Sequence, residues 1–133
     1  MSATNVFFDT NVVLHLLSAD TAKAERAEEL LAAGGVVSVQ VLNEFASVAS
    51  RKLRMPMTEI REVLSIVRVL CSVGPLSITT HDLALDLTER FRLSFYDSLI
   101  VAAARLAACD TLYSEDMQDG RRIDGVLIQN PFR

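Results

Sequence analysis

Four acidic residues stand out because each follows a short apolar, strand-like run or lies near the start of a helix-like run. They are Asp9, Glu44, Asp97 and Asp116. In an open α/β sheet, chemistry gathers outside the carboxyl ends of the strands. Carboxylates that meet there repel one another, and a divalent cation relieves that repulsion. The pattern therefore predicts a metal-dependent site for an anionic substrate, and a phosphodiester fits this chemistry best.

The candidate ligands are carboxylates, and they indicate a hard cation. Carboxylate oxygens suit Mg²⁺, with Mn²⁺ as a substitute, and such an ion polarises a phosphoryl oxygen and lowers the pKa of a bound water. Nothing resembles a zinc site. Cys71 and Cys109 lie in apolar, helix-like surroundings without metal-ligand spacing, and His15 and His81 are isolated. We expect both cysteines to be buried free thiols.

Each acid has a structural alternative when it is considered alone. Asp9 precedes a helix-like run and could be its N-cap. Glu44 could be a solvent-facing residue favoured near a helix N-terminus by the macrodipole. Asp97 lies three residues after Ser94, which fits a capping box. The functional interpretation depends on the combination of the four acids. If each had only its structural role, all four would face one crevice by accident.

The fourth acid is the hardest to choose, because several acids lie close together in this part of the sequence. The neighbours of Asp116 are Glu115, Asp119 and Asp124. Beside the first acid, the Thr10 hydroxyl and the Asn11 amide could orient the carboxylate or a bound water. Ser114 lies two residues before Asp116.

Apolar runs rich in strand-forming residues alternate with segments of helical periodicity. The expected strands are 6–8, 36–39, 76–78, 111–113 and 126–128. The clearest helical segments are 22–33, 42–53, 60–70 and 99–107. This alternation predicts an α/β fold, a three-layer α/β/α sandwich around a central, mostly parallel five-stranded sheet. A switch in strand order between the first and fourth strands would place Asp9 beside Asp116.

Length and composition limit the number of domains and the kinds of partner that the chain can have. The 133 residues, half of them hydrophobic, favour a single domain spanning 1–133. A net charge of −4 argues against a free nucleic-acid binder but not against a nuclease, whose site acids count toward that total. The basic residues include the cluster Arg51, Lys52 and Arg54, which is either a solvated surface or a phosphate contact. The lack of a transmembrane or signal-like segment predicts a cytoplasmic protein without a membrane partner.

At these acids the sequence resembles the PIN-domain ribonucleases, and most closely the VapC-type toxins of bacterial toxin–antitoxin pairs. Four stretches carry the resemblance, in the family's order and over nearly the whole chain. They are FDTN at 8–11, QVLNEF at 40–45, YDSLIVAAA at 96–104 and LYSEDMQ at 112–118. Many relatives have a further acid two residues after the fourth one, where this chain has Gln118, so a second metal ion would be held less firmly.

The resemblance implies a metal-dependent ribonuclease. It assigns Asp9, Glu44, Asp97 and Asp116 as catalytic and metal-binding residues, with Asn11 and Ser114 in support. The cofactor would be Mg²⁺ or Mn²⁺ and the substrate RNA. The partner would be a small antitoxin whose C-terminal segment wraps the toxin and aims an Arg at the acidic site. A homodimer is expected, as symmetric pairs are the commonest oligomers.

Other functions fit the sequence less well. A phosphatase of the haloacid dehalogenase type needs a second Asp two residues after the first, where this chain has Asn11. A response-regulator receiver needs a Lys near the end of its last strand, but both lysines, Lys23 and Lys52, lie in helix-like segments. Two alternatives stay open: a weak or inactive PIN-like module that binds protein or RNA, and a housekeeping RNA-processing nuclease.

Overall fold

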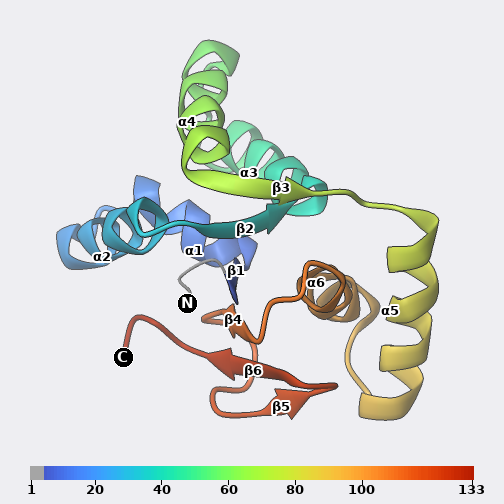
Figure 1. Cartoon of the computed structure of the whole chain (residues 1–133). Coiled ribbons are helices and arrows are strands. Elements are labelled where there is room, and N and C mark those ends of the chain that lie inside the picture. Colours follow the sequence, from blue (N-terminus) through green and yellow to red (C-terminus); the bar gives the residue numbers. More distant parts are fainter. Residues whose placement is uncertain (1–4) are drawn as a thin grey trace.

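The computed structural model describes residues 5–133, and its strands form one twisted sheet in the order β3-β2-β1-β4-β6-β5 (Figure 1). The strands are β1 (Val6–Phe8), β2 (Gly35–Ser38), β3 (Cys71–Gly74), β4 (Thr111–Tyr113), β5 (Arg122–Ile123) and β6 (Val126–Gln129). Strands β3, β2, β1, β4 and β6 pair with their neighbours in parallel. Strand β5 pairs antiparallel with β6 at the edge of the sheet. The predicted α/β class with a mostly parallel sheet is confirmed.

Helices connect the strands and flank the sheet. They are α1 (Thr10–Leu14), the 3-10 turn η2 (His15–Leu17), α2 (Thr21–Ala32), α3 (Val39–Arg51), α4 (Met57–Leu70), α5 (Ile78–Phe91) and α6 (Phe95–Leu106). Helix α6 packs against β2, β4 and β6, and α5 packs against α6 (Figure 1). Helix α3 packs against β2, and the right-handed rule for crossovers between parallel strands predicts that α1–α4 lie on the face opposite α6. No helix within residues 5–133 has the length and apolarity needed to cross a membrane.

The expected third strand at 76–78 is wrong. The strand is β3, which follows α4 without a turn, pairs with β2 and ends at Gly74. The chain then reaches Ser77, whose hydroxyl accepts a hydrogen bond from the backbone N–H of Thr80 and begins α5 with a full capping box. A cap hydroxyl three residues before its partner therefore outweighs the short apolar run as a local signal.

The sheet has a sixth strand that the five-strand prediction lacks. β5 is only two residues long and joins β6 through Asp124 and Gly125, which have φ angles of 51° and 87°. Two consecutive residues with positive φ form the tight turn that matches the twist of a hairpin, and Asp-Gly is a preferred sequence for it. The Asp124 carboxylate also pairs with Arg90 and Arg105, which fixes this turn against α5 and α6.

The core lies where the parallel strands meet the helices. Phe7 of β1 and Leu112 of β4 are fully buried in paired strands, in register with each other. Gly35 lets β2 lie close to β1, because a Cβ at this position would come within 2.5 Å of the Phe8 ring. The strand order reverses at β1, which lies between β2 and β4, so the crevice beyond the carboxyl ends of β1 and β4 is the expected place for a site.

Candidate active site

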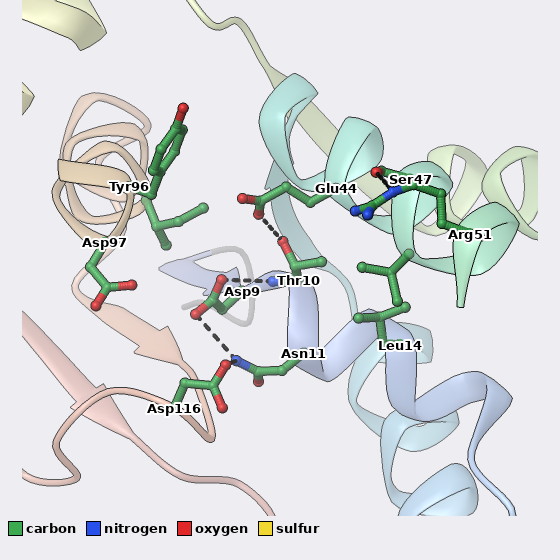
Figure 2. Close-up of a pocket in the computed structure, with 12 residues that line it drawn as sticks. Asp9, Thr10, Asn11, Leu14, Glu44, Ser47, Arg51, Tyr96, Asp97 and Asp116 are labelled. Carbon is green, nitrogen blue, oxygen red and sulfur yellow. Dashed lines mark hydrogen bonds between the residues drawn. The ribbon is translucent and has the colours of Figure 1, made fainter. Parts of the chain in front are cut away.

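The four predicted acids line one pocket of about 350 Å³ at this crevice. They come from four separate segments: the end of β1, the middle of α3, the first turn of α6 and the loop after β4. Figure 2 shows their carboxyl groups facing a common space. The prediction that distant acids converge is confirmed geometrically for Asp9, Glu44, Asp97 and Asp116.

Asp9 is the most deeply placed of the four acids, with 7% of its surface exposed. It is the N-cap of α1, where its Oδ1 accepts a hydrogen bond of 2.7 Å from the backbone N–H of Thr10. Its Oδ2 accepts hydrogen bonds from the hydroxyl of Ser114 at 2.8 Å and the amide of Asn11 at 3.3 Å. Asp9 is therefore both an N-cap and a lining residue of the pocket, and its two carboxylate oxygens have different partners.

The environment of Asp9 disfavours its charged form. The pKa of this carboxyl is raised from its ordinary 3.8 to about 6, chiefly by burial and to a smaller extent by the charges of Asp97 and Glu44. Hydrogen bonds from Ser114 and Thr10 act in the opposite direction. Repulsion among the acids thus contributes, as expected for crowded carboxylates, but burial is the larger cause.

Glu44 lies on the face of α3 that borders the pocket. Its Oε1 accepts a hydrogen bond of 2.5 Å from the Thr10 hydroxyl, and its Oε2 accepts one of 3.4 Å from the Gln40 amide. Helix α3 begins after the N-cap Ser38, so Glu44 is past the first turn. The macrodipole alternative fails for this reason, and the partners of Glu44 tie α3 to the start of α1.

Asp97 has only half of the capping box suggested by its spacing. The Ser94 hydroxyl accepts a hydrogen bond from the backbone N–H of Asp97 at 3.1 Å. The reciprocal bond from the Ser94 backbone N–H to the Asp97 side chain is absent from the described part of the chain. The Asp97 carboxylate instead faces the pocket, where its charge acts on Asp9 (Figure 2).

Asp116 joins the site through a shared partner. The Asn11 amide donates hydrogen bonds to Oδ2 of Asp9 at 3.3 Å and to Oδ2 of Asp116 at 3.2 Å (Figure 2). The buried hydroxyl of Ser114 donates to Asp9 and accepts from the backbone N–H of Asp116. The predicted supporting roles of Asn11 and Ser114 thus have a structural basis, because these side chains link the ends of β1 and β4.

The neighbouring acids of the loop after β4 face away from the pocket. Glu115 lies 2.7 Å from the ring Nε2 of His15 and 2.8 Å from the ammonium of Lys23. These contacts, with the Lys23 hydrogen bond as the largest cause, lower the pKa of Glu115 below its ordinary value. Asp119 accepts a hydrogen bond from the backbone N–H of Asn130. Among these three acids of the loop, Asp116 lines the pocket and Glu115 and Asp119 do not.

Replacing Glu115 should show whether this residue only ties the loop after β4 to His15 and Lys23 or also acts in the pocket. Glu115→Ala should lower the free energy of unfolding at pH 7 by about 1 kcal/mol, because it removes a partly exposed ion pair with Lys23 and a side-chain contact with His15. Its effect on any cleavage activity should stay below about tenfold, since Glu115 touches no pocket acid. Because its folded pKa is depressed, the stabilisation should be present above pH 4.5 and disappear as pH falls through the folded pKa. Thermal melts at several pH values measure the first effect, and a loss of activity equal to that of Asp116→Ala would contradict a role limited to tying the loop.

The suitability of this pocket for a metal ion depends on the type of ligand atoms that line it. Four carboxylates line it, and carboxylate oxygens are hard ligands that suit Mg²⁺. In the arrangement of residues 5–133, however, no three His, Cys, Asp or Glu side chains form a group that could hold an ion. Several of the oxygens instead accept hydrogen bonds from Thr10, Asn11 and Ser114. A cation bound beside Asp9 would offset the cost of burying its charge, which the raised pKa of this carboxyl reflects.

Other pocket residues were not among the predicted site residues. Ser47 and Arg51 of α3 and Tyr96 of α6 line the pocket, and Gln40 holds Glu44 from one turn earlier. Helical spacing contains a signal for three of them, because positions 40, 47 and 51 lie one or two turns from Glu44 on the same face of the helix. Tyr96 is signalled only by its place directly before Asp97.

Comparison with known proteins agrees with this geometry. The PIN domain family matches residues 6–125, and the chain belongs to that family. No match is found among curated proteins.

Solved structures share the fold. A chain of a toxin–antitoxin complex from Klebsiella pneumoniae is 19% identical, with a TM-score of 0.70 over 95% of this chain and 97% of that one. VapC20 of Mycobacterium tuberculosis, a toxin that cleaves the Sarcin-Ricin loop, is 23% identical, with a TM-score of 0.66 over 84% and 89%. A chain of VapBC2 from Rickettsia felis, bound to a DNA fragment from its promoter, is 17% identical, with a TM-score of 0.68 over 94% and 97%. At these identities the likeness establishes the PIN fold.

Proposed function

We propose that this chain is a Mg²⁺-dependent endoribonuclease, with Mn²⁺ as a substitute, and the toxin of a type II toxin–antitoxin pair. The observation that carries the proposal is the convergence of four acids from four separate segments on one pocket of a PIN domain. An inactive binding module fits less well, since it gains nothing from keeping a buried, unfavourable charge at Asp9.

The proposed role of each acid in binding the ion follows from how deeply the acid is buried. Asp9 would be the anchoring ligand, because the cap bond and Ser114 fix both of its oxygens. Glu44, Asp97 and Asp116 are more exposed and would complete the ligand set from the other three segments. When bound, the ion would polarise a phosphoryl oxygen and lower the pKa of a water. Thr10, Asn11 and Ser114 would hold the carboxylates in position through the hydrogen bonds described above.

The toxin role draws on the structural relatives. Two of the three similar structures are described as a toxin–antitoxin complex or a VapBC pair, and the third is described as a toxin. An antitoxin segment with an Arg would suit this pocket, because a guanidinium pairs with carboxylates and competes with the metal ion. Homodimerisation and a cytoplasmic location stay predictions of the sequence.

Expression in the native host tests the toxin role. The chain alone should arrest growth, and co-expression of the neighbouring small open reading frame should relieve the arrest because its product would occupy the acidic pocket. Asp9→Asn is the matched control, since it keeps the shape and should be harmless. Growth curves and immunoblots at equal protein level provide the measurement. Normal growth with a protein that is an active ribonuclease in vitro would contradict the toxin role and favour a housekeeping RNA-processing nuclease.

A further inference from the structure

The acidic pocket contains one basic side chain and one exposed aromatic side chain that the proposed metal chemistry does not use. Arg51 comes from the last turn of α3, and Tyr96 from the first turn of α6. Figure 2 shows them on opposite sides of Glu44, with the Arg51 guanidinium directed back toward that acid. The two side chains therefore border the space that the four carboxylates face.

The guanidinium of Arg51 is available for an outside partner. Its Nε donates a hydrogen bond of 3.0 Å to the Ser47 hydroxyl, which orients the group. Across residues 5–133, Arg51 forms no ion pair, although it lines the same pocket as four acids. A planar guanidinium with free terminal N–H groups matches the oxygens of a phosphate.

Tyr96 offers a flat surface at the edge of the pocket. The Tyr96 residue is 68% exposed, so its ring is largely open to solvent. The ring packs edge-on against Phe95, with centroids 6.0 Å apart, and Phe95 packs in turn on His81 at 5.7 Å. These contacts support the ring from one side. A nucleobase can stack on an exposed aromatic ring only when the base is unpaired and splayed from a helix.

We propose that Arg51 binds a phosphate and Tyr96 stacks a base of an unpaired RNA segment lying across the acidic pocket. The inference rests on the proposed ribonuclease function and assigns to it two side chains that position the RNA. Arg51 and Tyr96 are positioning residues here, because neither contributes a carboxylate to the metal chemistry. Arg51 also offsets part of the repulsion that an incoming phosphate meets from the four acids.

Steady-state cleavage of a labelled RNA in Mg²⁺ tests the assignment through separate KM and kcat values. Tyr96→Ala and Arg51→Ala should each raise KM about tenfold with a smaller change in kcat. Tyr96→Phe should keep the wild-type KM because the ring remains. Arg51→Ala should also reduce the dependence of log KM on log salt by about one phosphate contact, whereas Arg51→Lys should retain that dependence. Arg61→Ala, at an exposed position of α4 outside the pocket, is the matched charge control.

The same RNA annealed to its complement should be cut at least about tenfold more slowly, because its bases cannot stack on Tyr96. Melting temperatures near the wild-type value would confirm that the variants are folded. Wild-type KM for both alanine variants, or equal cleavage of the duplex, would overturn this inference while leaving the nuclease intact. Weaker binding of the small partner protein with unchanged KM would assign the pair to protein docking and would also overturn it. Absence of cleavage by the wild-type chain would instead remove the proposed function itself.

Discussion

Asp9→Asn should lower the rate of Mg²⁺-dependent RNA cleavage by roughly 100-fold or more, because it removes the charge of the proposed anchoring ligand. The substitution nearly preserves side-chain shape. An Asn oxygen at this position can still accept the cap hydrogen bond from the Thr10 backbone N–H. The loss should therefore come from the missing negative charge rather than from a disordered α1. Initial rates at saturating RNA, with Mg²⁺ varied, measure both the rate and the apparent affinity for the ion.

The matched control is Asp119→Asn. Asp119 is an acid of the loop after β4, but its carboxylate accepts a hydrogen bond from the Asn130 backbone N–H and does not line the pocket. An Asn oxygen can also accept that bond, so this variant should keep activity within about twofold. Wild-type cleavage by Asp9→Asn, especially in the presence of a chelator, would refute the metal role of Asp9.

The second large effect concerns stability in the absence of divalent ions. The pKa of Asp9 rises from 3.8 to about 6 on folding, chiefly through burial, so the folded state binds a proton more tightly than the unfolded chain. This group should therefore cost nothing near pH 3 and an increasing amount as pH rises through 4 to 6. The cost should level off above the folded pKa at about 3 kcal/mol. Asp9→Asn lacks this penalty at every pH.

The difference in unfolding free energy between Asp9→Asn and the wild type should thus shift in favour of the variant by about 3 kcal/mol between pH 3 and pH 7. A constant offset is expected in addition, because the amide nitrogen that replaces Oδ2 of Asp9 cannot accept the hydrogen bonds from Asn11 and Ser114. Urea titrations in chelator measure the difference, and Asp82→Asn on the exposed surface of α5 controls for the loss of one negative charge. A difference that does not change with pH would show that Asp9 is charged without penalty. Mg²⁺ should stabilise the wild type more than the variant.

Local signals in the sequence predict much of this fold. The apolar runs at 6–8 and 111–113 coincide with β1 and β4, since each is a short buried strand bounded by polar residues. The position of β3 is predicted wrongly from the sequence. Helix α4 is followed directly by β3 without a turn residue, and the Gly74-Pro75 pair lies at the end of this strand rather than at its start. β5 is too short for any periodicity, and only the Asp124-Gly125 pair indicates it.

The site could be predicted as far as backbone placement determines it. Asp9 and Asp116 follow parallel neighbouring strands, so the α/β rule alone brings them to the same edge of the sheet. The orientation of side chains depends on distant partners. Glu115 and Asp116 are adjacent in sequence, yet Lys23 of α2 and His15 of η2 draw Glu115 away while Asn11 holds Asp116 at the pocket. Likewise, only the packing of α3 against α1 places Arg51 in the same pocket as the acids.

In the proposed function, the four converging carboxylates form a metal-dependent ribonuclease site. The most direct measurement is a gel assay of the purified chain on a panel of cellular RNAs, in Mg²⁺, in chelator, and in chelator followed by excess Mg²⁺. Asp9→Asn protein prepared in parallel controls for contaminating ribonuclease. We predict discrete internal cuts in Mg²⁺, none in chelator, full recovery on adding the ion back, and almost none with the variant. Cleavage that persists in chelator and is equal in the variant, or intact RNA under every condition, would contradict the claim.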